Sequence, residues 1–245
     1  MLNRIVLVAL LAGGLAGLAG SLLQQLTVVP LILAAEVYEK APLHHHHEMG
    51  SAVSMQDATA APQVPSAAPG PEEAPWRGYQ RVAITTVATV GAAVGFSLML
   101  LVLMISSGDT LDWKRALGWG AAGFVVCGLA PSMGLAPELP GSSAASLETR
   151  QLWWVGTAIA TAAGLWLMLR AGAQWRIAVG VLLLLAPHVI GAPHPEAFAS
   201  NVPAELAAAF TARSLVLQAV LWLMMAGFAG YFWSRGEPAA SASAA

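Results

Sequence analysis

Apolar residues in this chain come in long blocks and do not alternate with polar ones. Six blocks can be read, at residues 5–33, 82–105, 116–133, 152–170, 175–192 and 212–233. Each is long enough, or nearly so, for a helix that crosses about 30 Å of hydrocarbon. Only helices and closed barrels satisfy their backbone polar groups in lipid, and these blocks lack the alternation of barrel strands. The pattern predicts an all-α, polytopic helical membrane bundle with about six transmembrane helices.

Two of the blocks leave other interpretations open. Arg170 and Arg176 leave only a tight turn before the fifth block, and Pro187 interrupts its far end, so a count of five spans stays open. The first block could be a secretory signal with Arg4 as its charged start. Its apolar run continues well beyond the small residues 16–21, further than a signal peptide needs, which favours an uncleaved anchor.

Composition agrees with the membrane interpretation. Apolar residues make up 57% of the 245 positions and charged residues 10%, whereas about 25% of a soluble domain is charged. There is no P-loop, dinucleotide fingerprint, nucleophile elbow or basic patch in the sequence. We therefore expect a protein that is not an enzyme, uses no organic cofactor and binds no nucleic acid, with the lipid bilayer as its surroundings.

The chain divides into four regions. Residues 1–37 are expected to form the first transmembrane helix and its outer end, and residues 38–81 an extramembrane loop rich in Pro and Ala, which predicts disorder. Residues 82–235 then form the helical membrane domain, and residues 236–245 a disordered tail. The long loop carries the strongest chemical signal of the sequence.

That signal is a run of histidines closed by a carboxylate: His44, His45, His46, His47 and Glu48. Imidazole is the commonest protein ligand for divalent first-row metals, and a purification tag would normally sit at a terminus, so we interpret the run as a native capture site. The alternative is a solvated loop with an incidental histidine run. Because only neutral imidazole binds metal, capture should weaken below about pH 6.

Two proline-broken segments add further candidate ligands. APHVIGAPHP contains His188 and His194, and GLAPELPG centres on Glu138. Broken helices are where transporters place ion sites, and mixed nitrogen and oxygen ligands suit cobalt, nickel or zinc. With Glu36, from the end of the first block, these side chains are predicted to line an ion entrance beside the histidine loop. The alternatives are interfacial, hydrogen-bonded histidines and a solvated glutamate.

Small residues predict how the helices pack, and charges predict how the bundle is oriented in the membrane. Stripes of small residues let helices approach closely, and three are predicted to be packing surfaces: Ala9–Gly13–Gly17–Ser21, Gly91–Gly95 and Gly156–Ala160–Gly164. Cytoplasmic loops carry an excess of Lys and Arg, and this modest bias places the N-terminus in the cytoplasm. Polar residues within the blocks, among them Thr157, Thr161 and Gln218, offer only a thin line for a conduit.

Several motifs in one order resemble the CbtA family of cobalt transporter subunits. They are LTVVPLILAAEVYE, a histidine-bearing loop, GLAPELPG, RQLWW, and APHVIGAPHPE followed by VPAELAAAF. The resemblance implies a bacterial inner-membrane protein that imports cobalt and works with a very small, single-helix, histidine-bearing CbtB subunit. It also implies five spans, where the blocks predict six.

Together these features predict the membrane subunit of a cobalt importer, with nickel or zinc as other cargoes and a homo-oligomer compatible with the sequence. His44 to His47 and Glu48 would capture the ion, and His188, His194, Glu36 and Glu138 would line its entrance. One alternative is a metal-sensing or scaffold membrane protein that binds the ion and moves nothing. Another is a haem-binding subunit with His188 as axial ligand.

Overall fold

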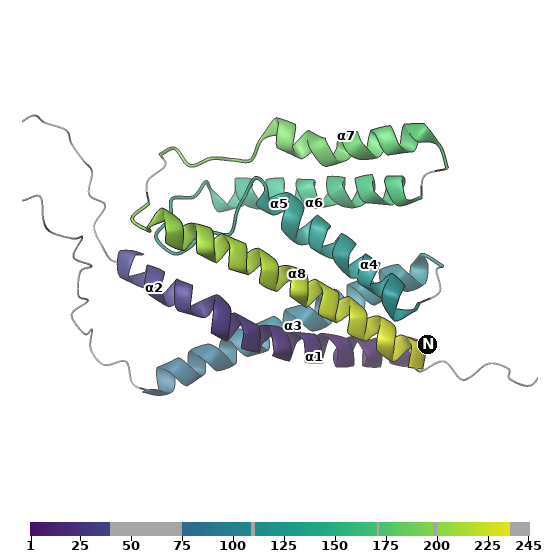
Figure 1. Ribbon diagram of the computed structural model, residues 1–245, viewed down its shortest axis with the longest axis horizontal. Coiled ribbons are helices and arrows are strands. Elements are labelled where there is room, and N and C mark those ends of the chain that lie inside the picture. Colours follow the sequence, from purple (N-terminus) through teal and green to yellow (C-terminus); the bar gives the residue numbers. More distant parts are fainter. Residues whose placement is uncertain (40–74, 109–110, 171, 198–199, 236–245) are drawn as a thin grey trace, which may run out of the picture.

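The computed structural model describes residues 1–39, 75–108, 111–170, 172–197 and 200–235, and Figure 1 shows the helices that these ranges form. In chain order they are α1 (Leu2–Thr27), α2 (Val29–Glu39), α3 (Pro75–Ser106), α4 (Trp113–Phe124), the π-helical turn η1 (Val125–Leu129), α5 (Ala130–Ser132), α6 (Leu147–Leu169), α7 (Gln174–Ile190) and α8 (Ala204–Arg235). The predicted helical bundle is confirmed.

The core of the bundle lies where α1, α3, α4 and α8 meet. A Cβ atom added to Gly13 would lie 2.4 Å from the Cα of Val94, and one added to Gly17 would lie 2.6 Å from the Cα of Val90. Only glycine permits so close an approach of two helix backbones. Fully buried side chains such as Leu101 and Met225 fill the space around this contact. The predicted packing role of the first small-residue stripe is therefore confirmed.

The second stripe behaves differently. Gly91 and Gly95 are exposed on α3, and a Cβ added to either meets no atom within 4 Å in the part of the chain that the structure describes. The prediction that they form a packing surface is wrong within this chain, because α3 turns its neighbouring small residue, Ala93, toward α1 and leaves the two glycines on the outer side.

The remaining helices form a second layer. Helix α4 packs along α8, where Gly123 makes room for the ring of Trp222, and a Cβ added to Gly123 would lie 2.4 Å from that ring. Helices α6 and α7 lie side by side as an antiparallel pair (Figure 1) and contact the rest of the bundle mainly through α5 and η1, with a ring contact between Trp166 of α6 and Trp119 of α4. This arrangement separates an inner group, α1, α3, α4 and α8, from an outer pair.

Both ends of the described chain lie at the same end of the bundle (Figure 1). Arg4 at the start of α1 donates to the carbonyl of Trp233 near the end of α8, and its guanidinium carbon lies 4.1 Å from the centre of that indole ring. The short connections that follow α3 and α6 lie at this end too, where Arg170 donates to the carbonyl of Ser107 over 3.1 Å. The C-terminal ends of α2, α5 and α7 lie at the opposite end (Figure 1).

Four described helices are long and apolar enough to cross a membrane by themselves: α1, the stretch Gly78–Ser106 of α3, α6 and α8. Three of the predicted blocks differ from a straight span. Block 116–133 is built from α4, η1 and α5 in succession, and block 175–192 forms α7, a helix of 17 residues that passes through Pro187 and ends at Gly191, where φ is 88°. Block 5–33 contains a break at Val28, because Pro30 cannot donate a backbone hydrogen bond to the preceding turn.

Candidate metal site and a buried polar seam

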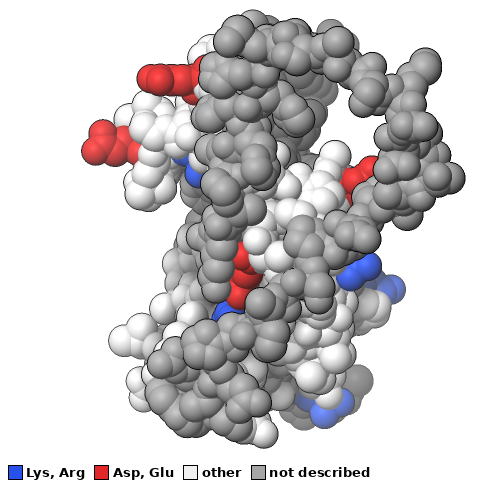
Figure 2. Space-filling model, turned by 90° about the vertical axis from the view of Figure 1, so that its left-hand side faces the viewer, with Lys and Arg blue, Asp and Glu red and all other residues white. Residues whose placement is uncertain are grey.

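The two ends of the bundle carry opposite charge among the described residues. The end that holds both described chain ends has six basic residues and one acidic residue: Arg4, Lys114, Arg115, Arg170, Arg176 and Arg235, with Asp112. The opposite end has six acidic and four basic residues: Glu36, Glu39, Glu138, Glu148, Glu196 and Glu205, with Arg77, Arg81, Arg150 and Arg213. Figure 2 looks onto this acidic end and shows red carboxylate side chains at several places on it. A cation that approaches the molecule is attracted to this end.

The two carboxylates predicted to line an entrance each lie beside an arginine. Glu36 on α2 forms an ion pair with Arg81 on α3, and Glu138 forms one with Arg150 on α6, with 3.0 Å between Oε2 and Nη2. All four side chains are partly exposed, and pairs of this kind contribute only about 0–1 kcal/mol to stability. The arginines repel a metal cation, so direct ligation by either carboxylate requires the arginine to move aside.

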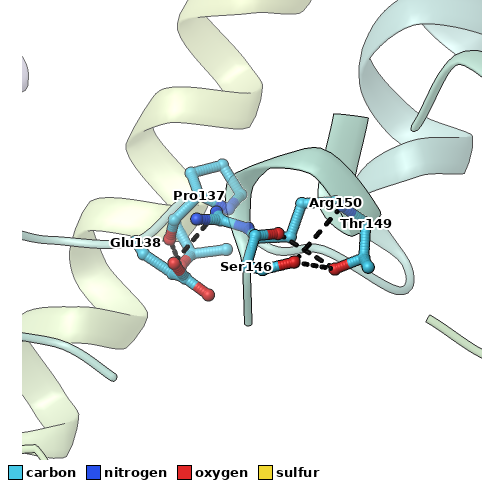
Figure 3. A network of polar contacts seen from close by, with 6 residues as sticks. Pro137, Glu138, Ser146, Thr149 and Arg150 are labelled. Carbon is cyan, nitrogen blue, oxygen red and sulfur yellow. Dashed lines mark hydrogen bonds and ion pairs between the residues drawn. The ribbon is translucent and has the colours of Figure 1, made fainter. Parts of the chain in front are cut away.

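Polar contacts hold the segment around Glu138 against the start of α6 (Figure 3). Thr211 of α8 donates to the carbonyl of Pro137 over 3.0 Å, and Ser146 caps the first turn of α6 by accepting from the backbone N–H of Thr149. Ser142 pairs with Ser200 in an isolated antiparallel bridge, which joins this segment to the one after α7. The two proline-broken segments also contact each other directly, since a Cβ added to Gly134 would lie 2.9 Å from Cβ of Ala192.

A small apolar cluster packs beneath these segments. Leu139, Val202 and Phe210 contact Val28 and Ala35 of the broken first block. At the break the carbonyl of Thr27 has lost its helical donor and accepts instead from Arg213 Nη1 over 3.2 Å. The break is therefore a built feature of the acidic end, with its backbone satisfied by a side chain from α8.

The predicted histidine ligands occupy two different settings. His188 lies near the end of α7, half-buried, with its ring edge-on to Trp153 of α6 at a centroid distance of 6.0 Å. His194 is exposed in the segment that follows. His44 to His47 and Glu48 lie outside the described residues. Within the described ranges no three side chains of His, Cys, Asp or Glu lie close enough together to hold a metal ion.

A line of buried polar atoms runs along α6 below His188. The Nε1 atom of Trp153 and the hydroxyls of Thr157 and Thr161 are buried without a hydrogen-bond partner in the described structure, and both threonines are 0% exposed. Their spacing of four residues places them on one face of the helix. Buried polar groups are nearly always hydrogen-bonded. Three such groups without a partner on one face of α6 therefore indicate a region suited to a bound water molecule, polar group or ion.

The facing helix, α7, contains a proline opposite these groups. The contacts Trp153–His188 and Gly164–Gly180 set the antiparallel register of the pair, so the two threonines lie opposite the stretch of α7 between Gly180 and His188. Pro187 lies in that stretch, is buried and has no N–H to offer the carbonyl four residues earlier. Hydroxyls from one helix and a carbonyl without its usual donor from the other are ligands suited to a hydrated cation. We call this α6–α7 interface, from His188 to Thr161, the polar seam.

The polar seam is closed toward the basic end. A Cβ added to Gly164 would lie 2.7 Å from the carbonyl oxygen of Gly180, and one added to Gly180 would lie 2.4 Å from Cγ of Met168. The two backbones touch here, and the Met168 side chain packs next to the contact. The polar seam therefore runs from His188 at one end to the backbone contact of Gly164 with Gly180 at the other.

Sequence reasoning noted Thr157 and Thr161 only as part of a thin polar line. The signal that could have revealed the seam was their four-residue spacing from Trp153. These residues lie in the block before the proline-containing block that carries His188. The sequence could not reveal that the hydroxyls lack partners, since that depends on how α6 and α7 are registered.

Comparison with known proteins places the whole chain in one family. No curated protein and no solved structure matches the sequence. The family described as "Probable cobalt transporter subunit (CbtA)" matches residues 2–234, almost the entire chain and all of its described helices up to the last residues of α8. The chain therefore belongs to the CbtA family of probable cobalt transporter subunits.

Proposed function

We propose that this protein is the membrane subunit of an importer for divalent cobalt, and that the ion enters the bundle through the polar seam. The observation that carries the proposal is the set of three unpaired buried polar groups on α6, with an imidazole at their outer end. An aquated cation that leaves bulk water needs replacement ligands along its path. The seam offers them in a line.

Capture would begin outside the seam. His44 to His47 and Glu48 would raise the local metal concentration at the acidic end and pass the ion to His188 and His194. Glu36 and Glu138 would contribute once Arg81 and Arg150 swing away, since both ion pairs are partly exposed and weak. Nickel and zinc prefer the same mixture of imidazole and oxygen ligands, so selectivity for cobalt would arise further along the path.

The charge asymmetry supports an orientation for this path. With six basic residues against one acidic residue at the end that holds both described chain ends, the positive-inside rule places that end in the cytoplasm. The acidic end and the mouth of the seam would then face outward from a bacterial inner membrane. Import would run from the acidic end to the basic end.

The chain would work with other components. A small single-helix subunit of the CbtB type, with histidines of its own, would supply further ligands, and a homo-oligomer is compatible with the exposed face of α3 around Gly91 and Gly95. The chain would carry no organic cofactor and would catalyse no reaction. The inward movement would be driven by an ion gradient or by a partner.

A metal-sensing or scaffold protein is the second candidate. The observation that favours it is the closure of the seam at Gly164 and Gly180, which leaves a binding site with one mouth. A sensor would bind cobalt in the seam and transmit a change of shape, whereas a transporter must open the Gly164–Gly180 contact in each cycle. Accumulation of the ion inside cells distinguishes the two.

The test is radioactive cobalt accumulation in cells that express the chain together with its small partner. A variant in which His44 to His47, His188 and His194 are all alanine serves as the comparison, at equal abundance in the membrane. Accumulation above that of empty cells, lost in the variant, is the expected result. Equal accumulation in both, no higher than in empty cells, would refute import and favour the sensor.

A further inference from the structure

An apolar groove lies between α4 and α8 at the basic end, away from the polar seam. It has a volume of about 710 Å³ and is lined by residues such as Trp113, Leu117, Gly227 and Tyr231. Trp113 is 53% exposed and Tyr231 41% exposed, so the groove opens on the outside of the bundle. In a membrane-spanning bundle this surface faces lipid.

Two cations stand at the end of the groove, each over an aromatic ring that lines it. The ammonium nitrogen of Lys114 lies 5.7 Å from the centre of the Trp113 ring, and the guanidinium carbon of Arg235 lies 4.6 Å from the centre of the Tyr231 ring. Cation–π contacts hold the charged groups near the rings and leave their N–H donors available to an anion. Both cations belong to the basic end of the molecule.

The nearby carboxylate does not cancel these charges. Asp112 accepts from the backbone N–H of Arg115 over 2.8 Å as the N-cap of α4, and its other oxygen lies 4.0 Å from Nε of Arg115. Neither Lys114 nor Arg235 forms an ion pair with a carboxylate of the described chain. An apolar groove with two cations at its interfacial end is complementary in shape and charge to an anionic phospholipid.

We propose that the groove is a binding site for an anionic phospholipid. One acyl chain lies along Leu117 and Gly227. The headgroup lies between Lys114 and Arg235, where its phosphate and either a second anionic group or a diol accept from the two cations. A basic pocket between transmembrane helices selects anionic headgroups because each cation adds attraction that a zwitterionic lipid partly cancels. The site is separate from the polar seam, since it lies on different helices and at the end of the bundle opposite His188.

The acyl chain and the headgroup can be tested separately because Gly227 offers room for a side chain. A Cβ added there meets only Leu117 Cδ2, at an ordinary contact distance of 3.5 Å. Gly227→Phe therefore fills the groove without a backbone clash. Gly91→Phe, at an exposed glycine of α3 with no atom within 4 Å of an added Cβ, is the matched control.

The experiment measures lipid retention by the purified full-length chain. Delipidated protein in detergent is titrated with phosphatidylglycerol or phosphatidylcholine, and bound lipid is counted by native mass spectrometry. The unmodified chain should retain phosphatidylglycerol about tenfold better than phosphatidylcholine, and Lys114→Gln with Arg235→Gln should lower this preference to about twofold. Arg176→Gln, which removes a cation 5.6 Å from the Trp175 ring at the same end but outside the groove, should leave the preference unchanged.

Each remaining outcome has a definite meaning. Gly227→Phe should abolish retention of either lipid, and Gly91→Phe should not. Equal retention of both lipids by the unmodified chain, or a loss of preference in Arg176→Gln as large as in the double variant, would overturn the proposal. A dimeric mass that disappears in Gly227→Phe would also overturn it, because a second copy of the chain would then occupy the groove.

Discussion

Replacing Thr157 and Thr161 by valine tests the polar seam most directly. Valine has nearly the shape of threonine, with a methyl group where the hydroxyl was, so the substitution removes the polar atom and keeps the packing. Both side chains are fully buried and neither hydroxyl has a partner in the described structure. If the seam serves an ion, the double variant should be more stable than the original protein and should transport less.

The stability change follows from the cost of an unpaired buried hydroxyl. Leaving such a group unsatisfied costs about 1–3 kcal/mol, and in a bilayer the unfolded reference state is also poorly hydrated, so the lower end applies. The two sites lie one helical turn apart and share surroundings, which makes their effects less than additive. We expect the double variant to gain about 1–2 kcal/mol, equivalent to a rise in melting temperature of about 2–8 °C.

The transport change has the opposite sign. Loss of two ligand groups that replace water around a cation raises the barrier in the seam, and about 1.4 kcal/mol is enough to slow passage tenfold. Cobalt accumulation should therefore fall about tenfold at equal abundance of the protein. Melting is followed by fluorescence of the detergent-solubilised protein, and accumulation by radioactive cobalt in cells.

Ser97 provides the control. Its hydroxyl is also buried and unpaired, but it lies on α3 and not on α6. Ser97→Ala should raise the melting temperature without affecting accumulation. Unchanged accumulation in the threonine double variant would refute the ion path, and a lower melting temperature would show that the hydroxyls have partners and that the reasoning from burial is wrong.

Three further substitutions probe the mouth of the seam, the entrance carboxylate and the core. His188→Phe keeps an aromatic ring beside Trp153 but removes both ligand nitrogens, so uptake should fall about tenfold with an unchanged melting temperature, and equal uptake would remove this histidine from the path. Arg81→Gln removes the cation that pairs with Glu36, so the cobalt concentration for half-maximal uptake should fall about two- to fivefold, and a rise would show that the pair holds the entrance in shape. Gly13→Leu places a side chain against the backbone of α3 and should lower the yield of monodisperse protein in size-exclusion chromatography; survival of the variant would contradict the close approach of α1 and α3.

The helical membrane class could be predicted from the sequence because the bilayer acts on the chain locally. Block length and the scarcity of charge define a span without reference to any other part of the protein. The close packing of Gly13 and Gly17 was predictable for a similar reason, since only small residues let two helices touch. The same pattern was misleading at Gly91 and Gly95, because a stripe shows that a close approach is allowed and does not show whether a partner is present.

The candidate site was only partly predictable. Residue type indicated that His188, Glu36 and Glu138 could be ligands, but no pattern in the sequence pairs Glu36 with Arg81 or Glu138 with Arg150. Those pairs depend on how distant helices are registered. The interruption at Pro187 was anticipated, although α7 continues as a helix through it, whereas the break before Pro30 in the first block was not predicted.

The division of the bundle indicates where movement would have to occur in transport. Helices α1 and α3 are joined by glycine contacts in which a Cβ on Gly13 would fall 2.4 Å from a Cα atom, and such an interface cannot open without losing its packing. Helices α6 and α7 are bound mainly to each other, and the barrier between the seam and the basic end is one backbone contact, Gly164 on Gly180, beside the flexible Met168 side chain. A small tilt of α7 against α6 would separate those glycines and leave the inner group undisturbed. Under the proposed function, alternating access would be a movement of the outer pair about the seam, with His188 at the end of the seam where the ion enters.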